Sequence, residues 1–214
     1  MTRTRHDTLE SALRAGPEPR EQQTTSAVAA SERLLARVGA EGLADVVYGP
    51  LDSPFGTLHA ALTRRGLVRL SFPEEGEAEL LQELSRRLSP RVVRGADRLD
   101  PLRRELDEYF GGRRRRFELQ LDWSLIGPFA RRVLRRTSAI PYGGSSSYGE
   151  IAAEAGSPRA ARAAGNALGA NPIPIVIPCH RVLHAGGGLG GYGGGLERKR
   201  WLLELEGALG DRGR

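Results

Sequence analysis

The first half of the chain has short apolar runs followed by two amphipathic segments. Residues 57–62 and 67–70 are separated by a turn-forming Arg65-Gly66 pair, which is typical of a β-hairpin. Residues 77–88 place leucines at helical spacing. Residues 99–110 repeat that spacing and stop at two glycines, a common end of a helix. The pattern therefore predicts two strands and then two helices.

A further strand is predicted where Phe117, Leu119 and Leu121 alternate with polar residues. Strands and helices of this number and length pack around one small core. Residues 46–122 are therefore expected to form an α+β domain.

Residues 123–214 have the pattern of a second, helical domain. An apolar face at Phe129, Val133 and Ile140 predicts a helix that ends before Pro141. Proline favours such an end because it lacks the N–H that would continue a helix.

Two shorter helices are predicted next. The run 147–150, Ser-Tyr-Gly-Glu, is a capping box that opens a helix to Ala155. Ser157 and Pro158 are expected to cap and begin the following helix, which runs to Leu168. Two short helices across a glycine turn are typical of a helix-turn-helix.

The second of these helices has two different faces at 100° per residue. Arg159, Arg162 and Asn166 share a narrow polar arc, which would face nucleic acid in a helix-turn-helix. The opposite side carries alanines 160, 164 and 167. An alanine-rich packing helix with a solvated arginine face has the same pattern, so the helix alone does not decide the function.

Residues 1–45 differ in composition from both domains. They are polar up to about residue 30, so we expect a disordered extension with a short helix at 31–38. The first residues lack the apolar core of a signal peptide, and no apolar run is long enough to span a membrane. We therefore expect a cytoplasmic protein, in a bacterial-type cytosol.

Composition narrows the chemistry. The formal net charge of +6 permits a polyanionic partner without requiring one. The single cysteine excludes an intramolecular disulfide and a cysteine-rich zinc site. Cys179, His180 and His184 lack the paired spacing of metal ligands, so no metal is expected.

The most unusual stretch is 171–182, Asn-Pro-Ile-Pro-Ile-Val-Ile-Pro-Cys-His-Arg-Val. Three prolines fix the backbone among apolar and β-branched residues, so Cys179 and His180 are delivered to one buried place. A buried thiol is ordinarily inert. An adjacent imidazole can take its proton and leave a nucleophilic thiolate.

This stretch, with Ser-Tyr-Gly-Glu upstream and Gly-Tyr-Gly-Gly-Gly-Leu downstream, resembles the O6-alkylguanine-DNA alkyltransferases, or methylated-DNA–protein-cysteine methyltransferases. The resemblance is strong over residues 129–207 and looser over 51–121. It implies a ribonuclease H-like first domain and a winged helix-turn-helix catalytic domain. It also implies direct-reversal DNA repair with no cofactor.

The resemblance assigns a role to five residues around the thiol. Cys179 matches the alkyl acceptor, and His180 draws off its proton through water. Glu206 matches the carboxylate that orients the histidine, and Asn171 holds the turn around the cysteine segment. Tyr148 matches the phenol that gives a proton to the departing guanine and contacts the neighbouring phosphate.

Further residues match the DNA face and the base pocket. Arg162 matches the arginine that enters the minor groove and replaces the extruded base. Tyr192 matches a wall of the guanine pocket. Gly193 follows it where many relatives have serine, which leaves open how bulky an alkyl group the pocket accepts. The remaining expected contacts are Arg159, Ala161 and Asn166 on the DNA, and Val176 and Pro174 in the pocket.

The implied reaction is a single-turnover transfer of an alkyl group, methyl first, from O6 of guanine to Cys179. O4 of thymine is a second candidate. The target lies inside the duplex, so the base must be flipped out. The partner is double-stranded DNA containing O6-alkylguanine. We expect a monomer in solution, and the sequence leaves open whether copies cluster on DNA.

Two other functions fit part of the pattern. A winged-helix transcription factor would use the helix-turn-helix and the glycine-rich loop 185–195, but would leave the Pro-Cys-His-Arg run without a role. A hydrolase using Cys179 and His180 would need a bend, because adjacent side chains of an extended chain point to opposite faces. It would also need an oxyanion hole, for which the sequence has no evident candidate.

Overall fold

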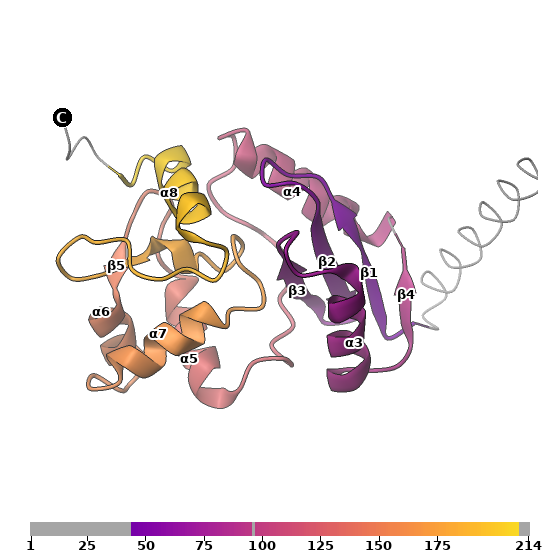
Figure 1. The fold of residues 1–214 in the computed structure, drawn as a ribbon, viewed down its shortest axis with the longest axis horizontal. Coiled ribbons are helices and arrows are strands. Elements are labelled where there is room, and N and C mark those ends of the chain that lie inside the picture. The colour runs from indigo at the N-terminus through magenta and orange to yellow at the C-terminus, as the bar shows by residue number, and fades with distance from the viewer. Residues whose placement is uncertain (1–43, 96, 210–214) are drawn as a thin grey trace, which may run out of the picture.

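The computed structural model describes residues 44–95 and 97–209. Figure 1 shows two lobes, one with a sheet flanked by helices, the other built of helices and loops. The helix expected at 31–38 lies outside the described residues.

The first lobe is organised around a four-stranded sheet. Its strands are β1 (Val46–Leu51), β2 (Leu58–Thr63), β3 (Gly66–Ser71) and β4 (Val92–Arg94), in the order β3-β2-β1-β4. The predicted hairpin is confirmed as β2 and β3, which pair antiparallel. β1 pairs antiparallel with β2 and parallel with β4. Sequence patterning did not predict β1 or β4, since β1 contains a Gly-Pro pair and β4 has three residues.

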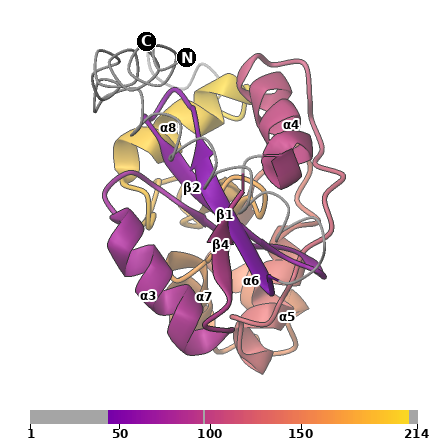
Figure 2. The same cartoon turned by 90° about the vertical axis from the view of Figure 1, so that its right-hand side faces the viewer.

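The two predicted helices cover opposite faces of this sheet (Figure 2). α3 (Glu77–Arg87) packs Leu80 and Leu84 on one face. α4 (Asp100–Phe110) follows the short 3-10 helix η1 (Asp97–Leu99) and buries its apolar side chains on the other face. Both helices are confirmed, α4 with the predicted end at glycine.

The predicted strand at Phe117, Leu119 and Leu121 is wrong. Only Leu121 forms an isolated parallel bridge, with Leu67 at the edge of the sheet. The alternation reflects packing instead, because all three side chains are partly buried against the core without a continuing ladder. This segment leads from the first lobe to the second.

The second lobe contains four α-helices among the described residues. They are α5 (Pro128–Thr137), α6 (Tyr148–Glu154), α7 (Ala161–Gly169) and α8 (Leu196–Leu205). Short elements lie between them: β5 (Ser146–Ser147) pairs with β6 (Val182–Leu183), and the 3-10 helix η2 spans Cys179–Arg181. The helix-turn-helix is α6 and α7.

Three predicted helix ends can be compared with this structure. The capping box at Ser147 and Glu150 is confirmed. α5 stops at Thr137, so Ile140 lies beyond it. Ser157 does not cap α7, which begins at Ala161, because the Ser157 N–H closes the end of α6 on the Ala152 carbonyl. Arg159 therefore lies in the turn rather than on the helix.

The two lobes share one buried core. Leu102 and Leu106 of α4 belong to the same cluster as Ile173 and Ile177 of the cysteine segment and Leu202 of α8. Burial of this apolar surface fixes the lobes against each other. The first lobe thus packs directly against the segment that carries Cys179.

A substitution at Gly66 tests how closely the segment between the two lobes, which contains Gln120, approaches β3. It has φ +127°, and a Cβ there would overlap the Gln120 carbonyl, which accepts a hydrogen bond from the Leu67 N–H. Gly66→Ala is expected to lower the free energy of unfolding by about 3 kcal/mol, through backbone strain and the clash.

Gly112→Ala is the matched control, since Gly112 has φ +69° with open space around its Cβ position. It is expected to cost about 1 kcal/mol from conformation alone. Urea unfolding measures both. Equal losses would contradict the inferred close approach at Gly66.

Candidate active site

The segment before the cysteine is a tight turn held by Asn171. Its side-chain carbonyl accepts the Ile173 N–H at 3.0 Å, and its Nδ2 donates to the Ile177 carbonyl at 2.9 Å. Ile175 has φ 71°, a strained value for a β-branched residue. The bonds from Asn171 and the flanking prolines hold that conformation in place.

Cys179 is presented at the start of η2 with 5% of its surface exposed. Asn171 Nδ2 also donates to its Sγ at 3.1 Å. Burial raises the pKa of the Cys179 thiol to about 11, although the Asn171 hydrogen bond opposes this. The thiol therefore needs a base to ionise at neutral pH.

His180 is fully buried beside a carboxylate. Its Nε2 lies 2.9 Å from Oε1 of Glu206, which is itself 5% exposed. Burial would raise the pKa of Glu206, but hydrogen bonds from His180 and Arg181 lower it to about 2. Glu206 is thus ionised and accepts, so Nε2 carries the hydrogen.

The other ring nitrogen of His180 is then an acceptor. Nδ1 is buried and finds no hydrogen-bond partner within the described ranges. Burial, aided by the nearby charges of Arg181 and Lys199, lowers the pKa of His180, with Glu206 opposing. The ring is therefore neutral, with one unengaged basic nitrogen in the site.

Sequence reasoning missed two partners of Glu206. Arg181 donates from Nε and Nη2 to the two carboxylate oxygens, at 2.8 Å each. Tyr109, on α4 of the other lobe, donates its phenol to Oε1 at 2.6 Å. Arg181 had a signal, as a charge inside an apolar run. Tyr109 had none, since only the tertiary fold brings it there.

A pocket of about 600 Å³ opens above Cys179 on the helix-turn-helix side. It gathers residues from α6, α7 and the glycine-rich loop, most of which the sequence had singled out. The residues singled out from the sequence that line this pocket are Tyr148, Ala161, Arg162, Asn166, Cys179, Tyr192 and Gly193. Arg159 is exposed in the turn and does not line this pocket.

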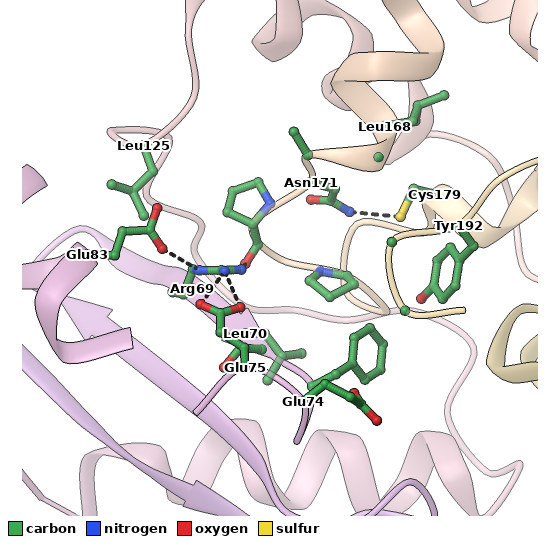
Figure 3. Close-up of a pocket in the computed structure, with 18 of the residues that line it drawn as sticks. Arg69, Leu70, Glu74, Glu75, Glu83, Leu125, Leu168, Asn171, Cys179 and Tyr192 are labelled. Carbon is green, nitrogen blue, oxygen red and sulfur yellow. Dashed lines mark hydrogen bonds and ion pairs between the residues drawn. The ribbon is translucent and has the colours of Figure 1, made fainter. Parts of the chain in front are cut away.

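A second pocket of about 510 Å³ reaches Cys179 from between the lobes (Figure 3). Asn171 and Tyr192 line the end near the sulfur (Figure 3), a charged group with Arg69 at its centre lines the other, and Pro174 also lines this pocket. Arg69 donates to both Glu75 and Glu83 there. Val176 lines neither pocket, and its partly buried side chain packs on the core.

The glycine-rich loop packs against Tyr148. The Tyr148 phenol donates to the Gly191 carbonyl at 3.2 Å, and burial raises its pKa. Lys199, the only lysine of the chain, is fully buried and donates to the carbonyls of Val182, Leu189 and Gly191. Burial lowers the pKa of Lys199 to about 8. The ammonium thus ties the loop to β6.

The described residues contain no group of three or more His, Cys, Asp or Glu side chains placed to hold a metal ion. In the same residues, no helix is both long and apolar enough to cross a membrane.

The site is thus a buried thiol, an imidazole and a carboxylate beside a helix-turn-helix. Comparison with known families matches both lobes. Residues 46–123 match the ribonuclease-like domain of 6-O-methylguanine DNA methyltransferase, and residues 128–208 match its DNA-binding domain. The chain belongs to this family.

Individual relatives agree with that assignment. A methylated-DNA–protein-cysteine methyltransferase of Mycolicibacterium paratuberculosis is 45% identical over 165 residues, covering 75% of this chain and 92% of the relative. The inducible methylated-DNA–protein-cysteine methyltransferase of Bacillus subtilis is 37% identical, covering 69% of this chain and 83% of the relative. The crystal structure of Mycobacterium tuberculosis OGT in complex with DNA is similar, with a TM-score of 0.65 and 41% identity. The match covers 76% of this chain and 93% of that one.

Proposed function

We propose that this protein repairs DNA by moving an alkyl group from O6 of guanine onto Cys179. One observation carries the proposal: the single cysteine lies under a pocket whose walls come from the helix-turn-helix and the glycine-rich loop. The relatives are named for transfer from methylated DNA to a protein cysteine.

The reaction is a displacement at the alkyl carbon. The Cys179 sulfur forms a bond to that carbon while the bond from carbon to O6 breaks and guanine leaves. The thiol proton passes through water to Nδ1 of His180, whose ring Glu206 orients. Tyr148, at the pocket wall, donates a proton to the departing base. A raised pKa keeps that phenol protonated beforehand.

Access to the sulfur requires a flipped base. Cys179 is too buried to reach an atom inside a duplex, and extrusion of a base costs a few kcal/mol. Arg162 is exposed at the start of α7 and lines the same pocket, so it can fill the gap left in the duplex. Exposed Arg159 and Asn166 supply further contacts to the DNA.

The product is a thioether, which nothing in the site hydrolyses, so each molecule acts once. O4-alkylthymine offers the same leaving group chemistry as a second substrate. We propose that the protein acts on duplex DNA as a monomer in the cytoplasm.

Cys179→Ala separates binding from transfer. The variant keeps the pocket and the DNA face, so its affinity for duplex DNA with O6-methylguanine should stay within about threefold of the wild type, while transfer should be lost. Binding is measured by fluorescence anisotropy and transfer by the amount of O6-methylguanine left in the DNA. Any transfer by the variant would show that another residue accepts the group.

Gly190→Ala tests the role of Tyr148. A Cβ on Gly190 would lie 2.5 Å from the Tyr148 phenol oxygen, so the phenol must move. We expect the single-turnover transfer rate to fall about tenfold or more, as for a displaced general acid.

Gly187→Ala is the control in the same loop. Gly187 also has positive φ, at +82°, but open space around its Cβ position. Its transfer rate should stay within about twofold of the wild type. Equal losses in the two variants would point to loop strain and remove the support for Tyr148.

A further inference from the structure

Tyr109 of the first lobe contacts the carboxylate of the site. Tyr109 is fully buried, and its ring packs between Phe117 and Tyr142 at centroid distances of 5.2 and 6.2 Å. Its phenol donates to Glu206 Oε1 at 2.6 Å, across 97 positions of sequence. Burial and the Glu206 charge raise the pKa of Tyr109 far above its ordinary value, so the phenol remains a donor.

Glu206 is saturated with donors. Oε1 accepts from Tyr109, His180 and Arg181, at 2.6, 2.9 and 2.8 Å. Oε2 accepts from Arg181 Nε at 2.8 Å and from the Gly143 N–H at 3.4 Å. A carboxylate has about four lone-pair sites. Its plane and the share of its charge that faces His180 are therefore determined by these donors together.

We propose that Tyr109 is a positioning residue for proton transfer: its phenol holds Oε1 of Glu206 against His180 and draws part of the carboxylate charge away from the imidazole. This inference rests on the proposed role of His180 as the base. It makes the ribonuclease-like lobe a part of the chemistry, since the relay is complete only when the two lobes are docked.

The direction of the effect follows from the charges around His180. Without the phenol, Oε1 carries more negative charge toward Nε2, which favours the imidazolium and raises the pKa of His180. The base must be neutral to accept a proton, so the acid limb of the transfer rate would move to higher pH. The other titratable or charged groups that face the ring or its carboxylate are Cys179, Arg181, Tyr192, Lys199 and Tyr142.

Tyr109→Phe removes the hydroxyl and keeps the ring that fills the core. Tyr142→Phe is the matched control, because its phenol donates to the backbone carbonyl of Leu205, one residue before Glu206, at 2.8 Å. Two readouts are measured for each: the pH profile of single-turnover transfer from O6-methylguanine duplex, and the pKa of His180 by NMR titration of its ring nitrogens. Urea unfolding reports whether both variants fold.

The expected result is an upward shift of about one pH unit in Tyr109→Phe, in both the acid limb and the His180 titration. Transfer should be slowed most at acid pH and approach the wild-type rate at alkaline pH. Tyr142→Phe should keep both midpoints.

Three results would overturn the inference. They are a Tyr109→Phe rate reduced by one factor at every pH, equal shifts in the two variants, and a Tyr109→Phe chain that does not fold. Each of these results would mean that the Tyr109 hydroxyl has a structural role only. If the wild-type protein transferred nothing, the proposed function would fail, and the His180 titration would still decide the role of Tyr109.

Discussion

The carboxylate of Glu206 is buried where both lobes, the cysteine segment and the end of α8 meet. A lone charge there would cost several kcal/mol, so its position depends on Arg181, His180 and Tyr109 all pointing at it. Replacing such a cluster with apolar residues often stabilises a protein. Its presence fits the function we propose, which needs a neutral imidazole with one unengaged basic nitrogen.

A second constraint acts on the thiol. The Asn171 hydrogen bonds and the prolines deliver Cys179 to a place too dry for it to ionise unaided. In the mechanism we propose, the sulfur depends on the His180–Glu206 pair for its reactivity and on the pocket beside α7 for its substrate. For a protein used once, this arrangement restricts the reaction to a group that has entered the pocket.

Local patterns predicted the parts of the fold that depend on local interactions. The hairpin, α3, α4 and the Ser147 cap follow from spacing, turn and capping chemistry. Local signals misled in two places. Ser157 makes a competing local bond that closes α6 instead of opening α7, and Phe117 to Leu121 pack on the core without pairing as a strand. The proline frame was enough to single out Cys179 and His180, but nothing local could pair Tyr109 or Arg181 with Glu206, or show Lys199 buried under the loop.

In the function we propose, Cys179 itself accepts the alkyl group, once. The most direct measurement is the mass of the intact protein and of its Cys179 peptide after incubation with excess duplex DNA containing O6-methylguanine. The expected result is a gain of one methyl group in place of one hydrogen, confined to that peptide and stopping at one equivalent of repaired guanine. An unchanged protein mass with continuing turnover, or methyl on any other peptide, would contradict it.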